Sequence, residues 1–144
     1  MERDGLRLIA VVLGTAEPRS QFRESIKLYN YGFAKFRGVV VAKEGQQIKE
    51  LPVEKGKLDK LEVVTKDKVS AITLKGKEKE INHEILLPKA VEAPIKKGQK
   101  IGEIVVKRGN EKLYSMDLVA KQSVEKAGFG QHFEKVLLKT FGAL

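Results

Sequence analysis

Near the start of the chain stands the stretch Arg3-Asp4-Gly5-Leu6-Arg7-Leu8-Ile9-Ala10-Val11-Val12-Leu13-Gly14. Residues 6–13 are apolar at almost every position, which predicts a strand covered on both faces in the interior of a sheet. One strand and the helix that follows cannot provide such a sheet. We therefore expect residues 1–37 to be the end of a larger domain whose body lies outside this sequence.

An amphipathic helix is predicted directly after this strand. Glu17-Pro18 is suited to open a helix, because proline is tolerated in the first helical turn. Apolar side chains then recur at spacings of four, three, four and three, which places them on one helical stripe. The stripe consists of Phe22, Ile26, Tyr29, Phe33 and Phe36. We interpret it as a core-packing face.

The middle of the chain has the pattern of a small β domain. Short β-rich runs alternate with glycine and lysine turns, which is typical of an antiparallel sandwich or barrel. The predicted strands span residues 39–42, 47–53, 60–65, 69–74, 82–87, 101–107 and 112–119.

The last segment, residues 122–144, is predicted to form an amphipathic helix. A basic helix with one apolar side suits the surface of an anionic membrane. The residues expected to bind the membrane are Phe129, Phe133, Val136, Leu137 and Phe141, together with Lys135 and Lys139. The alternative is that this helix packs on its own β domain or on a neighbouring protein.

Composition narrows the functional classes. The 144 residues carry a formal net charge of +9 and no cysteine, so a disulfide framework and thiolate chemistry are excluded. His83 and His132 show no ligand spacing, and we expect neither a metal nor a cofactor. No apolar run is long enough to span a bilayer. Tyr114 is the single aromatic of the β region, which argues against a nucleic-acid-binding surface.

The opening stretch, together with Tyr31-Gly32-Phe33 and the hairpin pattern of residues 94–106, resembles the C-terminal part of serine-type D-alanyl-D-alanine carboxypeptidases, the low-molecular-mass penicillin-binding proteins. The resemblance implies a mainly β fold: a small antiparallel β-sandwich domain, preceded by a strand-helix remnant of an α/β transpeptidase-like domain and followed by the amphipathic helix. The expected domains are 1–37, 38–120 and 121–144.

The catalytic signatures of that family are Ser-x-x-Lys, Ser-x-Asn and Lys-Thr-Gly. Ser123-Val124-Glu125-Lys126 fits the first by chance, because it lies in a terminal amphipathic segment. No Ser-x-Asn triplet occurs, and Lys139-Thr140-Phe141-Gly142 is not Lys-Thr-Gly. We expect no catalytic residue, so this chain alone should be inactive.

The resemblance implies that the parent enzyme trims peptidoglycan pentapeptides on the extracytoplasmic face of the bacterial cytoplasmic membrane, with this region as a stalk or positioning module. Its implied partners are anionic lipid and, through the parent enzyme, peptidoglycan. The alternative function, from a different class of protein, is a free-standing β module that binds cell-wall glycan or a protein partner. Residues 93–102 also resemble the hairpin of biotinyl and lipoyl carriers, but no Met-Lys-Met or Asp-Lys-Ala triplet is present.

Self-association is the last expectation from the sequence. Without the rest of its domain, the segment from residue 6 to 36 leaves apolar side chains without cover, and such segments pair with other chains. The residues expected to take part are Leu8, Val11, Phe22, Ile26, Tyr29, Phe33 and Phe36.

Overall fold

The computed structural model describes residues 1–128 and 136–139. The chain divides into two compact units. The first comprises Met1–Val41, Ser70–His83 and Val106–Tyr114, and the second comprises Ala42–Val69, Glu84–Val105 and Ser115–Leu144. The first unit therefore contains residues from two of the three expected domains, and the division into 1–37, 38–120 and 121–144 stays a prediction.

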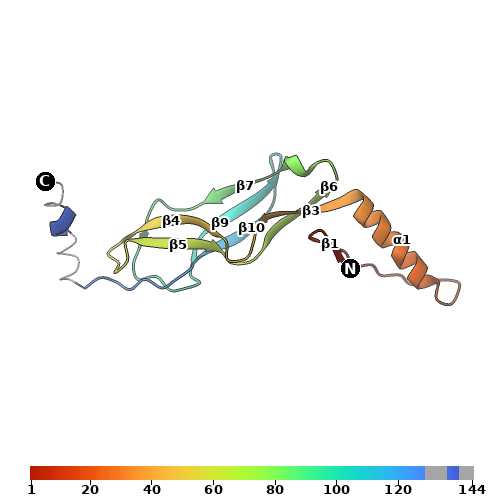
Figure 1. Cartoon of the computed structure of the whole chain (residues 1–144), viewed down its shortest axis with the longest axis horizontal. Helices are drawn as coiled ribbons and strands as arrows, with labels where there is room; N and C mark the ends of the chain where they lie inside the picture. The colour runs from red at the N-terminus through yellow and green to blue at the C-terminus, as the bar shows by residue number, and fades with distance from the viewer. Residues whose placement is uncertain (129–135, 140–144) are drawn as a thin grey trace. The chain divides into compact units, whose positions relative to one another are not determined.

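The chain is mainly β, as expected (Figure 1). The described elements are β1 (Glu2–Arg3), β2 (Leu6–Arg7), α1 (Ser20–Lys35), β3 (Phe36–Ala42), β4 (Gln47–Glu54), β5 (Lys60–Thr65), β6 (Val69–Leu74), a 3-10 turn (Glu78–Glu80), β7 (Ile81–Leu86), β8 (Val91–Glu92), β9 (Lys100–Arg108) and β10 (Glu111–Ala120). All seven strands predicted for the middle of the chain are present, and β5 and β6 have the predicted bounds.

Three sheets organise these strands. The largest has the order β7-β9-β10-β5-β4-β8, and β3-β6 and β1-β2 form two-stranded sheets. Strand β5 pairs antiparallel with β4 and with β10, whereas β4 pairs with β8 in parallel. An irregularity between Gln47 and Lys49 shifts the register of β4.

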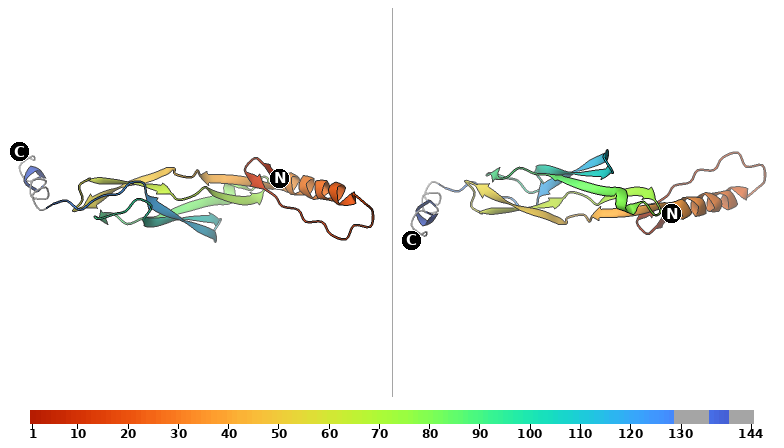
Figure 2. Two further views of the ribbon diagram at one scale, coloured as in Figure 1. Left: turned by 90° about the horizontal axis from the view of Figure 1, so that it is seen from below. Right: turned by 90° about the horizontal axis from the view of Figure 1, so that it is seen from above.

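The N-terminal hairpin replaces the long strand predicted for residues 6–13. Arg3 pairs with Leu6, and Asp4 and Gly5 both have positive φ, 50° and 75°, which is the backbone of a tight hairpin turn. Residues 8–16 have no regular secondary structure and run alongside α1 (Figure 2). The prediction of a strand to residue 13 was wrong, because β1 supplies a partner for two residues only.

The core of the second unit is formed by alternating side chains of its strands. Strand β5 has the burial pattern of a central strand, with apolar side chains covered on both faces. The fully or nearly fully buried apolar residues of this unit include Leu51, Leu61, Val63, Ile104, Val105, Leu118, Ala120 and Val124.

Residues 121–127 form an extended segment, here called the C-terminal strap. Val124 bridges Ile95 and Lys126 bridges Gly56, both in antiparallel sense. The helix predicted from residue 122 is therefore absent up to residue 128. The reason is that Val124 is buried in the β core, 1% exposed, and its backbone N–H donates to the carbonyl of Ile95 at 2.8 Å.

Candidate functional site

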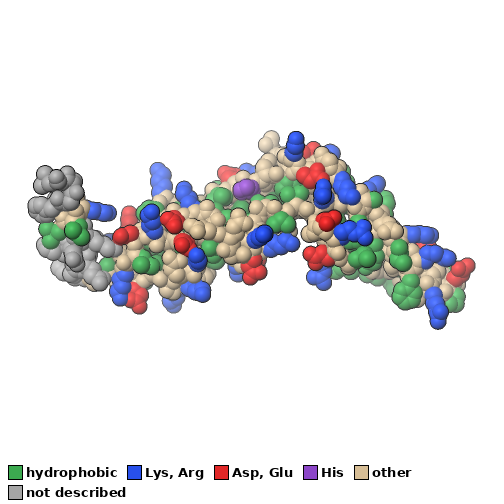
Figure 3. Space-filling view, viewed as in Figure 1, with side chains coloured by type: hydrophobic (Ala, Val, Ile, Leu, Met, Phe, Trp, Pro, Cys, Tyr) green, Lys and Arg blue, Asp and Glu red, His purple; other side chains and the backbone are tan. Residues whose placement is uncertain are grey.

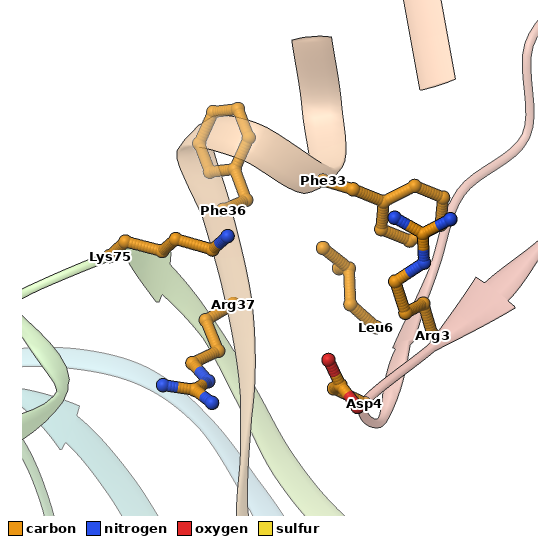
Figure 4. A pocket seen from close by; sticks show the side chains of 7 residues that line it. All are labelled: Arg3, Asp4, Leu6, Phe33, Phe36, Arg37 and Lys75. Carbon is orange, nitrogen blue, oxygen red and sulfur yellow. The ribbon is translucent and has the colours of Figure 1, made fainter. Parts of the chain in front are cut away.

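A pocket of about 360 Å³ lies in the first unit, at the junction of α1 and β3. Its lining residues are Arg3, Asp4, Leu6, Phe33, Phe36, Arg37 and Lys75 (Figure 4). Leu6 and Phe33 form the apolar part and are 2% and 6% exposed. The polar part comes from three segments: the N-terminal hairpin, β3 and the turn after β6.

Two glycines allow the N-terminal hairpin to approach this junction closely. A Cβ atom at Gly38 would lie 2.6 Å from the carbonyl oxygen of Gly5, and one at Gly32 would lie 2.5 Å from Leu8 Cδ1. The hairpin therefore contacts the end of α1 and the start of β3 through backbone as well as side chains. This contact buries Leu6, a side chain whose burial stabilises by about 1.5–3 kcal/mol.

The charged side chains of the pocket are held in different ways. The Arg3 guanidinium lies 4.9 Å from the centre of the Phe33 ring, in a cation–π contact visible in Figure 4. Arg37 Nη1 is 3.7 Å from Glu78 Oε1, an ion pair longer than a hydrogen bond. The turn carrying Lys75 is fixed by its backbone N–H, which donates to the carbonyl of Lys35 at 2.9 Å.

In the second unit, the C-terminal strap is hydrogen-bonded on two sides. On one side, Lys57 N–H donates to the carbonyl of Glu125 at 2.9 Å, and Ala127 N–H donates to that of Lys55 at 2.8 Å. On the other side, Lys97 N–H donates to Ser123 Oγ at 2.9 Å. The strap is therefore fastened between the β4–β5 turn and the turn that precedes β9.

Charge reinforces one of these attachments. The Lys57 ammonium donates a hydrogen bond to Glu125 and pairs with its charge, which lowers the pKa of the Glu125 carboxyl. Elsewhere in this unit, hydrogen bonds to Glu103 and to Asp117 raise the pKa of Lys100. These groups are all on the surface, so we interpret the shifts as surface pairing and not as the mark of a catalytic group.

The residues expected to bind a membrane are only partly within the described structure. Phe129, Phe133, Lys135 and Phe141 lie outside the described residues. Val136, Leu137 and Lys139 belong to a helical segment, residues 136–139, and are exposed. Val136, Leu138 and Lys139 also line a pocket of about 780 Å³ whose other walls are residues 52–56, Asp59 and Ala90. The membrane assignment stays a prediction.

The residues expected to drive self-association differ in how far they are buried. Phe33 is buried within its own chain, and Leu8, Tyr29 and Phe36 are half-buried. Val11, Phe22 and Ile26 are exposed, as are Ile9 at 81% and Leu13 at 87%. Figure 3 shows hydrophobic side chains among basic ones over α1. The expectation that the whole helical stripe lacks cover was wrong at Phe33, because the Arg3 side chain of the hairpin lies over its ring.

The residues that match the Ser-x-x-Lys signature are not arranged for catalysis. Ser123 and Lys126 lie in the extended strap, where side chains three positions apart point to opposite sides. Ser123 Oγ accepts a hydrogen bond from backbone. Within residues 1–128 and 136–139, no cluster of three or more His, Cys, Asp or Glu side chains is placed to hold a metal ion. In the same residues, no helix is long and apolar enough to cross a bilayer.

Sequence reasoning missed the pocket, although one signal was present. Asp4-Gly5 is a dipeptide that favours a tight two-residue hairpin, and that hairpin brings Arg3 to the junction. The positions of Arg37 and Lys75 carried no comparable signal, because their proximity depends on pairing between β3 and β6, which are distant in sequence.

The described residues form a small β domain closed by the C-terminal strap, which defines the class of domain. The chain belongs to the family described as "Penicillin-binding protein 5, C-terminal domain", whose model matches residues 36–126. The match includes most of the C-terminal strap, so the strap is part of the family's domain.

Named relatives agree with this assignment. The chain is 31% identical over 129 residues to D-alanyl-D-alanine carboxypeptidase DacF of Bacillus subtilis, covering 89% of this chain and 33% of that protein. It is 30% identical over 141 residues to D-alanyl-D-alanine carboxypeptidase DacA of Haemophilus influenzae, covering 96% of this chain and 36% of that protein. The chain thus spans about a third of the length of these relatives.

Solved structures show the same fold. Penicillin-binding protein 5 of Haemophilus influenzae superposes with a TM-score of 0.62 at 28% identity, over 72% of this chain and 30% of that one. A peptidoglycan synthesis regulatory factor, PBP3 of Streptococcus pneumoniae, superposes with a TM-score of 0.54 at 20% identity, over 75% of this chain and 32% of that one.

Proposed function

We propose that this chain is the non-catalytic C-terminal region of a D-alanyl-D-alanine carboxypeptidase, and that it positions the enzyme at the outer face of the cytoplasmic membrane. The family match and the names of the relatives support the parentage. The reading frame upstream of Met1 provides a direct test. It should encode Ser-x-x-Lys, Ser-x-Asn and Lys-Thr-Gly in that order, and their absence would contradict the parentage.

The C-terminal strap is the observation that carries the positioning role. It is bonded to two turns of the β domain, so the chain is held against the sheet as far as residue 127. A flexible linker would let the domain sample many distances from that point, whereas a bonded strap restricts them. This arrangement suits a module that holds another part of a protein at a set distance from a surface.

Basic and apolar side chains surround the strap and favour an anionic lipid surface as its partner. Leu58 in the β4–β5 turn is 46% exposed, and Lys96, Lys97 and Lys126 are exposed on the strap and the turn beside it. Each lysine close to an anionic bilayer contributes about 1 kcal/mol of attraction, which salt screens. An exposed leucine can enter the interface between them.

Co-sedimentation with vesicles tests this role. We expect the full chain to sediment with phosphatidylglycerol vesicles and not with phosphatidylcholine vesicles. Salt at about 0.5 M should release the chain from the vesicles, because it screens the attraction. A chain ending at Gly128 should bind much less, because it lacks the five apolar and two basic residues named above. Equal binding of the shortened chain would contradict the assignment of the residues beyond Gly128, and no binding by the full chain would contradict the membrane role; neither result affects the parentage.

A further inference from the structure

The pocket at the junction of α1 and β3 is lined by more positive than negative side chains. Arg3, Arg37 and Lys75 line it, and Asp4 is the one acidic lining residue. Among the described residues, Asp4 makes no hydrogen bond or ion pair with any of these three cations, and of the three only Arg37 has an ion pair, with Glu78 outside the pocket. Like charges held together by a fold repel one another, so an anion that enters the pocket is attracted by all three.

The apolar floor strengthens this attraction. Leu6 and Phe33 are almost completely buried, so one side of the pocket excludes water and lowers the local dielectric constant. Arg3 is oriented before any ligand arrives, because its guanidinium already lies over the Phe33 ring (Figure 4). A cation that is already in position loses less conformational freedom on binding than a free surface side chain.

The dimensions and chemistry select the kind of anion. About 360 Å³ is at the lower end of ligand pockets, which suits a small molecule or the end of a peptide. Guanidinium groups bind planar carboxylates through two parallel hydrogen bonds. Apolar side chains at Leu6, Phe33 and Phe36 provide contact for a small apolar group next to the carboxylate.

We propose that this pocket binds the C-terminal carboxylate of a short peptide with small apolar side chains. The Arg37 guanidinium and the Lys75 ammonium bind the carboxylate, and the Leu6–Phe33 floor contacts the adjoining side chain. The site is independent of the membrane role and of the parentage, because it rests on the geometry of the first unit alone.

Titration of the isotope-labelled full chain at low salt, followed by amide NMR, tests the site. The probe is N-acetylalanylalanine, and its C-terminal amide is the matched probe without a carboxylate. We expect the acid to shift signals of residues 3–6, 33–38 and 74–76, and the amide to leave them unchanged. Equal shifts with the amide, or no shift with the acid, would overturn the proposal. Inorganic phosphate should bind more weakly, and equal affinity would overturn the carboxylate assignment.

Substitutions of the charged lining residues should change the affinity for the acid in opposite directions. Lys75→Gln should weaken binding about tenfold, the loss of one charged hydrogen bond. Its fold is expected to persist, since the bond from Lys75 to Lys35 uses the backbone. Asp4→Asn should tighten binding, because it removes the acidic lining residue while asparagine tolerates the positive φ of 50°. Arg37→Lys should weaken binding although the charge remains.

Lys112→Gln is the control for net charge. Lys112 is exposed in the same unit and does not line the pocket, so its removal should leave the affinity unchanged. If Lys112→Gln weakens binding as much as Lys75→Gln, the attraction is a property of the whole basic surface and the proposed site is wrong. If Asp4→Asn weakens binding, the pocket assignment is wrong as well.

Discussion

At the scale of single residues, Gly38 sets how closely the N-terminal hairpin can approach β3. Its α-carbon faces the backbone of Gly5, so an added methyl group would meet a carbonyl oxygen that cannot rotate away. We expect Gly38→Ala to lower the free energy of unfolding by about 1–3 kcal/mol, the usual cost of overpacking. Urea unfolding measures it.

Gly128→Ala is the matched control for this substitution. A Cβ atom at Gly128 would have no heavy atom within 4 Å, so the same chemical change should alter the urea midpoint little. A midpoint of Gly38→Ala equal to that of the unmodified chain would mean that the hairpin is not seated on β3 in solution.

Tyr114 is a second residue whose role is local. Its hydroxyl accepts a hydrogen bond from Ser70 N–H at 2.8 Å and donates one to the Ser70 carbonyl at 2.6 Å. Tyr114→Phe leaves both backbone groups without this partner, and we expect a loss of about 1–3 kcal/mol in unfolding free energy. Tyr29→Phe removes a half-buried phenol that contacts Phe33 through its ring, so it should cost less. Thermal unfolding of both variants compares them.

At the scale of elements, the attachment of the C-terminal strap should depend on pH. Lys57 lowers the pKa of Glu125 in the folded chain, so the pairing stabilises the strap above the carboxyl's unfolded pKa. As the pH falls through the lowered folded pKa, this stabilisation is lost. We expect Glu125→Gln to reduce hydrogen-exchange protection of Ala127 N–H at neutral pH, and the difference from the unmodified chain to disappear in acid.

Glu44→Gln controls for the removal of one negative charge. Glu44 is exposed in the turn between β3 and β4, away from the strap in sequence, and its substitution should leave the protection of Ala127 unchanged. A difference between Glu125→Gln and the unmodified chain that persists undiminished in acid would show that the Lys57–Glu125 pair is not its cause.

Elements governed by local patterns could be predicted from the sequence. Helix α1 followed from the spacing of its apolar side chains, and the strands from β-rich runs bounded by turn residues. The strap could not be predicted this way, because Val124 and Lys126 pair with residues 29 and 70 positions away, Ile95 and Gly56. The strand predicted for residues 8–13 is absent for the converse reason: an apolar run forms a strand only where a partner strand exists.

The candidate sites also differ in whether a local sequence pattern could predict them. The membrane-binding residues were named from amphipathic pattern alone, and four of them lie outside the described residues. The pocket was not predicted, because Arg3, Arg37 and Lys75 come from segments that only the fold brings together. Charged residues of this kind have no periodic signature, so single-sequence reasoning has no means of grouping them.

At the scale of the whole molecule, exposed apolar side chains favour self-association. Phe22 and Ile26 are 66% and 59% exposed on α1, and covering each is worth about 1.5–3 kcal/mol. We expect the full chain to sediment as a dimer or larger species at high concentration, and the double variant Phe22→Ser, Ile26→Ser to sediment as a monomer. Ile72→Ser, an exposed position in β6, should not change the distribution. A monomeric unmodified chain would refute this expectation.

The chain as a whole should not react with penicillin. Acylation requires a serine oriented beside its base and an oxyanion site, and Ser123 is instead bonded to the Lys97 backbone. Mass spectrometry after incubation with penicillin should show no adduct. A stoichiometric adduct that disappears in Ser123→Ala would contradict the non-catalytic assignment.

The phenol of Tyr114 has a consequence for solubility. Strand β6 pairs with β3 on one edge, and an unpaired edge is a template on which foreign strands can add. By bonding both the N–H and the carbonyl of Ser70, the phenol occupies the slot that an incoming strand would need. Tyr114→Phe should therefore increase the rate of fibril or aggregate growth with protein concentration, whereas its effect on unfolding is independent of concentration. We thus expect a single hydroxyl group to protect this sheet against templated growth.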